Sequence, residues 1–419
     1  MSVLYEGGLV FDGTGRVLAD HGVMVDGDTI IAVAPLAEFS GHAGTRVDTT
    51  GGTLLPGLID CHVHLVYGGE ADPGAAQVKL SDGQITIRAL ENAQATLAGG
   101  ITAIRDCGGK DYLEFAVRDA VNTGRHLGPT IRAVGRMICM TGGHGNRIGR
   151  VADGVEEVIK AVREQIHAGA DQIKIMATGG VMTPGVNPED AHYTAEEIGA
   201  GIAEGKRFNR KSASHAQGSE GILNAVRGGI TSIEHGIFMT DECIEEMLAA
   251  GTYLVPTLAA VGNITGHADK GVPDYVIEKA TRVLDVHKDS VRRFHAAGGL
   301  IAMGTDAGTP FNLHGANALE LGYMVDIGIP ASDALVISTR NAADLLSLDD
   351  RGVIEKGNKA DLLVVDGNPV ENIAMAAEAA NHRLVIKDGI VARDRAAGGD
   401  GKTATPLAAR FATAAGAGF

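Results

Sequence analysis

The stretch LIDCHVHL, residues 58–65, is a short apolar run that ends with two histidines separated by one residue. Its length and its continuous apolar character are typical of a strand buried inside a parallel sheet. Side chains two positions apart on a strand point to the same side. His62 and His64 therefore share one face, and we expect Cys61 and Val63 to face the other side and pack against helices.

Seven further runs of similar character follow along the chain, and segments of helical period separate them. The expected strands are residues 58–65, 101–107, 130–138, 172–178, 212–216, 232–236, 252–258 and 300–308. The expected helices between them include residues 84–100, 155–170, 194–209 and 243–251. Alternating strands and helices predict a parallel α/β architecture, and eight such units favour a closed (β/α)8 TIM barrel over an open sheet.

Both ends of the chain carry a different pattern, in which short apolar runs alternate with Gly and Asp turns. Examples are GGLVFDG (7–13) and GVMVDGDTIIAV (22–33) near the start, and KADLLVVDGNP (359–369) and HRLVIKDGIVARD (382–394) near the end. Neither block is long enough to form a stable sheet alone, so we expect one small β-sandwich domain made from both ends. The expected division is 1–57 and 351–396 for this domain, 58–350 for the barrel, and 397–419 for an Ala/Gly-rich tail.

The composition excludes several classes of protein. Hydrophobic residues make up 45% of the 419 residues, which favours a folded chain with a substantial core over disorder. The formal net charge of −16 and the lack of a basic cluster argue against nucleic acid as a partner. The first 15 residues lack the pattern of a secretory signal, and no apolar run reaches about 18 residues, so we expect a cytoplasmic protein without membrane contact.

Ionisable residues recur at the ends of the expected strands. Besides His62 and His64, they are Lys174, His215, His235 and Asp306. Any one of them can be explained as a satisfied core residue or a helix cap. Six of them together at the carboxyl ends of five strands would be an unexplained burial of polar groups unless something coordinates them.

The four cysteines lie far apart and match no zinc or redox motif, so we interpret them as small buried residues.

With these positions in place, the chain resembles the amidohydrolase superfamily over almost its whole length. The segments LLPGLIDCHVHL (54–65), GITAIRDCGG (100–109), GTDAG (304–308) and KADLLVVDGNP (359–369) look like landmarks of that family. The segments QIKIMATGG (172–180), SASHAQG (212–218) and SIEHG (232–236) most resemble its imidazolonepropionase-like branch, which includes prolidase-type dipeptidases, carboxypeptidases and ochratoxin-degrading amidases.

The resemblance implies two divalent metal ions. Its implied ligands are His62, His64, Lys174 and Asp306 for one site, and Lys174, His215 and His235 for the other. Lys174 is implied to react with carbon dioxide, because an ammonium would repel the metals whereas a carbamate offers two oxygens that can bridge them. Nitrogen and oxygen ligands suit zinc best, with manganese and cobalt as alternatives. A hydroxide that bridges the metals would attack an amide carbonyl, and Asp306 would carry its proton to the leaving amine.

Other residues near the same end of the expected barrel are weaker candidates. His144, in TGGHG after the third strand, is either a catalytic residue that stabilises the oxyanion and binds substrate or a solvated loop residue. Tyr193, His192 and His314 are expected to contact substrate from neighbouring loops. We expect Glu234 to face away from the side of His235 and to have a structural role.

These expectations define a leading function and two alternatives. The leading one is a metal-dependent hydrolase that cleaves dipeptides or N-acyl amino acids. The first alternative opens a cyclic amide, such as a lactam or imidazolone, and the second is a non-catalytic barrel, which the presence of all six ligands disfavours. The substrate is expected to be a small molecule. The loops after the third, seventh and eighth strands are expected to set which substrate side chains the enzyme prefers. The resemblance also implies a homo-oligomer.

Overall fold

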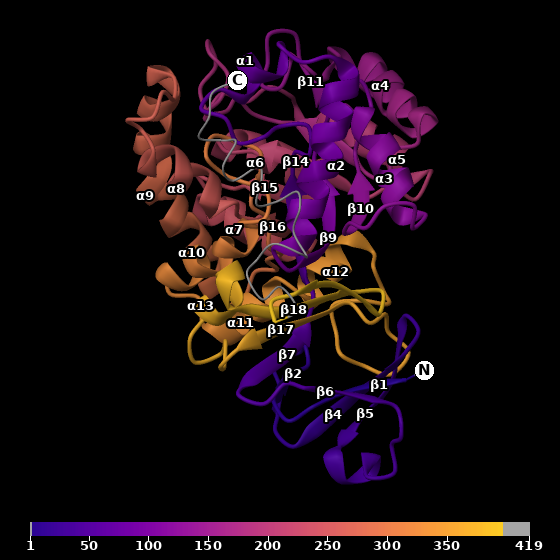
Figure 1. Cartoon of the computed structure of the whole chain (residues 1–419). Coiled ribbons are helices and arrows are strands. Elements are labelled where there is room, and N and C mark those ends of the chain that lie inside the picture. The colour runs from indigo at the N-terminus through magenta and orange to yellow at the C-terminus, as the bar shows by residue number, and fades with distance from the viewer. Residues whose placement is uncertain (1, 397–419) are drawn as a thin grey trace.

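The computed structural model describes residues 2–396 and shows a mixed α/β fold (Figure 1). The expected tail, 397–419, lies outside the described residues. The parallel strands are β8 (Leu58–Val63), β9 (Ile101–Asp106), β10 (Thr130–Ala133), β11 (Ile138–Cys139), β12 (Arg150–Val151), β13 (Ile173–Met176), β14 (Ser212–Ala216), β15 (Ser232–His235) and β16 (Tyr253–Val255). Seven of the eight expected strand segments therefore contain at least one strand.

Helices follow most of these strands and cover their outer side (Figure 1). They are α1 (Pro73–Gln77), α2 (Asp82–Ala98), α3 (Leu113–Asn122), α4 (Gly154–Ala168), α5 (Ala195–Lys206), α6 (Ser219–Arg227), α7 (Asp241–Ala250), α8 (Leu258–Gly266), α9 (Asp274–Ala296), α10 (Glu320–Asp326), α11 (Ala331–Ile337), α12 (Arg340–Leu346) and α13 (Ala374–Ala377). Short 3-10 helices are η1 (Leu36–Phe39), η2 (Asn317–Leu319) and η3 (Ala379–Asn381). None of these helices is both long and apolar enough to cross a membrane.

Apart from β12, which lies at the edge of its sheet beside β11, the parallel strands lie in chain order. One sheet contains β8, β9 and β10, and a second runs β12-β11-β13-β14-β15-β16. Residues 300–307 connect the two, because Ile301 forms a parallel bridge to Leu254 in β16 and Ala307 forms one to Val63 in β8. Across the other gap, the backbone N–H of Asp171 donates to the carbonyl of Ala133 in β10 at 2.8 Å.

Two expected strands differ from the prediction. The third, 130–138, is divided at Gly135, whose φ of 75° turns the chain, and β11 then pairs with β13 instead of continuing β10. The eighth, 300–308, forms bridges but no continuous strand. Asp306 and Gly308 have φ values of 61° and 103°, and this left-handed backbone cannot continue a ladder.

Strands from the two chain ends pair with each other, as expected. They form two sheets. One has six strands in the order β19-β18-β17-β7-β2-β3, and the other has four in the order β5-β4-β1-β6. The strands are β1 (Val3–Glu6), β2 (Leu9–Phe11), β3 (Val17–Leu18), β4 (His21–Asp26), β5 (Thr29–Pro35), β6 (Thr45–Asp48), β7 (Gly52–Pro56), β17 (Leu362–Asp366), β18 (His382–Lys387) and β19 (Ile390–Asp394). One hydrophobic cluster, with Tyr5 and Val25 from one sheet and Leu54 and Leu362 from the other, joins them.

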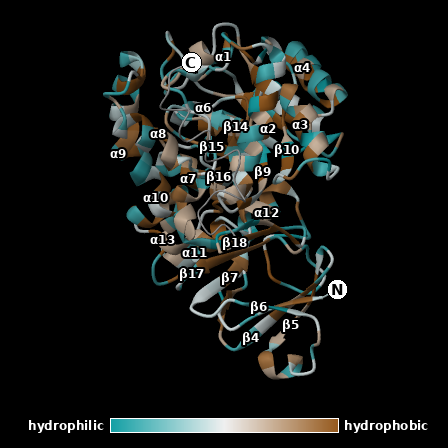
Figure 2. Cartoon of the chain, in the orientation of Figure 1, coloured by the Kyte–Doolittle hydropathy of each residue, from teal (hydrophilic) through white to brown (hydrophobic). Residues whose placement is uncertain are grey.

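Local sequence signals explain where the helices begin and which face they bury. Ser81 and Thr194 each form a capping box with the Gln or Glu three residues later, at the starts of α2 and α5. The long link 257–299 folds into α8 and α9, and α9 buries a stripe of side chains that includes Val276, Val283 and Phe294. Figure 2 shows the resulting mixture of brown and teal residues around outer helices such as α9, which is expected for amphipathic helices.

Candidate metal centre

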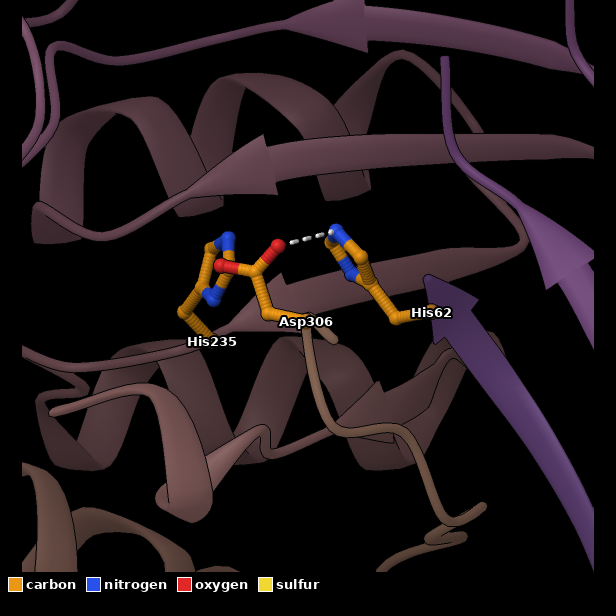
Figure 3. A group of neighbouring side chains, drawn as sticks. All are labelled: His62, His235 and Asp306. Atoms are coloured by element: carbon orange, nitrogen blue, oxygen red, sulfur yellow. Dashed lines mark ion pairs between the residues drawn. The ribbon is translucent and has the colours of Figure 1, made fainter. Parts of the chain in front are cut away.

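Histidines from β8 and β15 meet an aspartate from the segment that connects the two sheets (Figure 3). The Nε2 atoms of His62 and His64 lie 3.5 Å and 3.3 Å from the same Oδ1 atom of Asp306. One ligand atom from each of His62, His235 and Asp306 lies within 4.8 Å of the others. The structure therefore brings together residues that are far apart in the chain, at a spacing that one metal ion can span.

The ring of His215 extends this cluster. Its centroid lies 4.6 Å from that of His235, and the rings of His235 and His62 are 5.1 Å apart. His62, His215 and His235 are all buried, and desolvation lowers the pKa of each well below its ordinary value. Neutral imidazoles are the form that binds metals, so this environment suits ligands.

Each of the four histidines, His64 included, uses one ring nitrogen in a hydrogen bond to the protein. The bonds join His62 Nδ1 to Glu234, His64 Nδ1 to the Gly108 carbonyl, His235 Nδ1 to the Thr257 hydroxyl and His215 Nε2 to the Gly179 carbonyl, at 2.7–2.8 Å. The other nitrogen of each ring is left for the cluster. Such hydrogen bonds set the orientation of metal-binding histidines, so the arrangement fits a metal centre.

Lys174 lies on β13 beside these histidines and is 2% exposed. Its Nζ atom is buried and has no hydrogen-bond partner among residues 2–396. Lys174 lines the same cavity as His62, His215 and His235. A lone buried ammonium is costly. The orphaned amine therefore fits a carbamate shared by two metals better than it fits a structural role.

Glu234 corrects one expectation from the sequence. The register of β14 and β15 pairs Glu234 with His215, so both side chains face the same side of the sheet. His235 would then face away, but its φ of 73° turns its side chain back toward the cluster. Backbone in this region is strained for a histidine and is typical of functional sites. Glu234 is consequently part of the centre, because its carboxylate accepts a hydrogen bond from His62.

Arg105 is a second buried residue that the sequence reasoning missed. It is fully buried, and its Nη2 donates to Glu234 at 2.7 Å while its Nε donates to the carbonyl of Cys61 at 2.6 Å. The available signal was Arg105 itself, a charged residue within the strand segment ITAIRD, which ends with Asp106. The pair neutralises the Glu234 carboxylate that holds His62.

A cavity opens above the cluster. Its wall includes the side chains of Met176, Val181, Met182, Val261 and Ile264, and the proposed metal ligands form its floor. His144 also lines it: its ring lies 4.3 Å from that of His215, and its Nδ1 is 2.7 Å from the Thr183 hydroxyl. Burial lowers the pKa of His144 to about 3, so this ring is neutral near pH 7.

The three weaker candidates lie outside the lining of this cavity. Tyr193 is buried in the core, and its hydroxyl donates to the carbonyl of Ala152 at 2.6 Å. His192 is buried against Gly143, and its ring nitrogens lack hydrogen-bond partners in the described chain. His314 packs behind β8, where its Nε2 bonds to the backbone carbonyl of His64 at 3.2 Å. Loop position in the sequence could not reveal that these side chains turn inward, into the packing behind the site.

Comparisons with known proteins identify the family of this chain. Residues 53–391 match the model of the amidohydrolase family. An ochratoxinase from Aspergillus niger is 30% identical over 420 residues, covering 90% of this chain and 84% of that protein. An imidazolonepropionase from Micrococcus luteus is 26% identical over 389 residues, covering 87% of this chain and 92% of that protein.

A solved structure of a Xaa-Pro dipeptidase with bound methionine in its active site superposes with a TM-score of 0.86 at 34% identity, covering 93% of this chain and 99% of that one. These neighbours imply a fold of the TIM-barrel type, and proteins of this family generally use metal ions. The predicted membership of the imidazolonepropionase-like branch, which includes prolidase-type dipeptidases and ochratoxin-degrading amidases, is confirmed. The chain belongs to the amidohydrolase family and is a hydrolase that acts on amides.

Proposed function

We propose that this hydrolase cleaves the amide bond of dipeptides or N-acyl amino acids and releases an amino acid. The observation that carries the proposal is the convergence of His62, His235 and Asp306, each with one ligand atom within 4.8 Å of the others, on the floor of a cavity with apolar walls. Pockets that combine a polar reactive floor with apolar walls bind small organic molecules.

Two divalent metals are part of this proposal. His62, His64, Lys174 as its carbamate and Asp306 would hold one ion, and Lys174, His215 and His235 the other. When bound, such ions activate water near neutral pH and polarise an amide carbonyl. Zinc is the proposed metal, since the ligands are imidazole nitrogens and carboxylate-like oxygens.

The residues around the centre have separate proposed roles. Asp306 accepts the proton of the attacking water on a carboxylate oxygen and passes it to the nitrogen of the leaving amine. His144, neutral because of burial, donates a hydrogen bond to the carbonyl oxygen as negative charge develops there. Its Nδ1 contact with Thr183 orients the ring for this role.

The proposed leaving group follows from a relative and from the walls of the cavity. The similar Xaa-Pro dipeptidase holds methionine in its active site. In this chain, the cavity lined by Met176, Met182 and Ile264 offers an apolar surface on which such a side chain would pack. An apolar amino acid is therefore the proposed product.

The architecture around this site is also a proposal. The bridges of Ile301 and Ala307, and the bond from Asp171 to Ala133, support closure of all eight strand segments into one (β/α)8 barrel over 58–350. The hydrophobic cluster shared by the two end sheets supports a separate small β-sandwich domain, made of 1–57 and 351–396.

A substrate panel tests the proposed function. Purified protein supplied with zinc and bicarbonate would be assayed against dipeptides, N-acyl amino acids and cyclic amides, with product release followed by chromatography. We expect turnover of linear substrates with an apolar amino acid after the cleaved bond. Ring opening of lactams or imidazolones without any linear turnover would replace this proposal by the cyclic-amide alternative.

A further inference from the structure

Four charged side chains line the cavity, and three have an evident role. Lys174 and Asp306 belong to the candidate metal centre. Asp72 caps helix α1, since its Oδ1 accepts from the backbone N–H of Ala75 at 2.9 Å. The fourth is Arg147, in the loop that also carries His144.

The guanidinium of Arg147 forms neither a hydrogen bond nor an ion pair within 2–396, and the side chain is exposed. Its Nη1 lies so close to Gly74 that a Cβ there would be 2.7 Å away, which places the charge at the start of α1. Asp72 lies near the same glycine, yet its carboxylate is not within ion-pair distance of Arg147. The five N–H groups of this guanidinium are therefore available to a ligand.

The backbone around Arg147 is held without help from its side chain. The N–H groups of Ile148 and Gly149 both donate to the carbonyl of Gly145. The Nε of Arg136 donates to the carbonyl of Ile148 at 3.1 Å. A guanidinium that does not stabilise its own loop, and that faces a cavity, is better explained by a ligand than by the fold.

Tyr67 connects this charge to the metal centre. Its ring lies 5.9 Å from the ring of His64, and its hydroxyl makes no hydrogen bond in the part of the chain described. Tyr67 lines the same cavity as Arg147 and Asp306, so its hydroxyl can donate a hydrogen bond to a ligand there.

We propose that Arg147, together with the Tyr67 hydroxyl, binds the free α-carboxylate of the amino acid that the reaction releases. A guanidinium binds a carboxylate through two parallel N–H···O bonds, which a lysine or a neutral donor cannot reproduce. The formal net charge of −16 disfavours the approach of anionic substrates, and a guanidinium at the cavity counteracts this locally. This inference rests on the proposed function and deepens it by naming the residues that recognise the carboxylate of the leaving amino acid.

The test compares two substrates that differ in one group: N-acetyl-L-methionine and its decarboxylated analogue, in which hydrogen replaces the carboxylate. Both are assayed with wild type, Arg147→Met, Arg147→Lys and Tyr67→Phe. Arg125→Met is the matched control, because Arg125 is also exposed, has no side-chain partner in the described structure, and lies outside the cavity lining.

We expect Arg147→Met to raise KM for N-acetyl-L-methionine at least about tenfold, with little change in kcat and none for the decarboxylated analogue. Arg147→Lys and Tyr67→Phe should give smaller increases, and Arg125→Met should behave as wild type. Equal kinetic constants for wild type and Arg147→Met with N-acetyl-L-methionine would overturn the carboxylate site while leaving amide hydrolysis intact.

A binding measurement separates this inference from the proposed function. If metal-loaded wild type cleaves neither compound, the proposed function fails for this substrate class. Titration calorimetry with the same two compounds then decides the carboxylate site. Tighter binding of the acid to wild type than to Arg147→Met supports the site, and equal affinities reject it.

Discussion

The carboxylate of Glu234 accepts a hydrogen bond from Nδ1 of His62 at 2.8 Å, although 172 residues separate them in the chain. The same carboxylate pairs with the buried guanidinium of Arg105 at 2.7 Å. His62 must therefore carry its proton on Nδ1 and direct its unprotonated Nε2 toward Asp306. A residue that the sequence assigned to a structural role thus sets the orientation of a proposed metal ligand.

Glu234→Gln should weaken metal binding by about 10–100-fold, because the neutral amide polarises His62 less and its single oxygen cannot serve all three donors, His62, Arg105 and Ser232. Chelator competition measures the metal affinity, and circular dichroism checks that the fold is retained. Glu220→Gln, an exposed change on α6, is the control. Unchanged affinity in Glu234→Gln would show that this carboxylate does not support the ligand.

Glu234→Ala should be more damaging to stability than Glu234→Gln. It leaves Arg105 as an uncompensated buried charge, which typically costs about 3–5 kcal/mol. Urea unfolding of the two variants beside wild type measures the difference. Equal stability of the two variants would mean that the buried ion pair contributes little beyond its packing.

Lys174→Ala should remove bound metal and activity together while leaving the fold intact. Without the carbamate the two ions repel each other. The fold loses no hydrogen bond of the amine, which has no partner in 2–396, and loses only the packing of the buried side chain. Metal analysis, turnover and thermal unfolding are measured on one preparation, with the exposed Lys356→Ala as control. Retention of two metals and normal turnover would rule out the bridging role.

Asp306→Asn should keep much of the metal but reduce turnover by about 10²–10⁴-fold, the usual contribution of a general acid–base group. Asparagine retains an oxygen that can bind metal, but it cannot take up and release the proton. Metal content and kcat are determined in parallel. Activity within tenfold of wild type would exclude the proton-transfer role.

Glu320 predicts a pH dependence of stability away from the centre. It is fully buried and accepts the backbone N–H groups of Leu258 and Ala259, both at 2.7 Å, at the start of α8. Burial raises its pKa from 4.5 to about 8. Between these values the folded protein holds a proton that the unfolded chain releases, so this contribution to stability is complete below pH 4.5 and declines as the pH rises toward 8.

Urea unfolding of wild type and Glu320→Gln at pH 5, 6.5 and 8.5 measures this effect. The variant should be less stable at low pH by about 1–3 kcal/mol, because glutamine accepts only one of the two N–H groups well. Its deficit should shrink as the pH rises, since glutamine does not titrate. Glu355→Gln, an exposed change, controls for the loss of a carboxyl group. A deficit independent of pH would contradict the raised pKa.

The sequence determined the strand and helix alternation, the pairing of the two chain ends and the six residues proposed as ligands. These features depend on short-range periodicity and on residue type, and both are legible along the chain. The sequence also placed His144 near the site, because the loop that follows a strand begins at the edge where the other strand ends meet.

The tertiary structure alone decided which side chains face the centre. Positive φ at His235 and Asp306 overrides the simple alternation of strand side chains, and strand register turns Glu234 to the side of His215, where it bonds to His62. The same packing turns Tyr193 and His314 into the core. Such outcomes depend on backbone conformation and on contacts between residues far apart in the chain, which a local pattern of residue types does not encode.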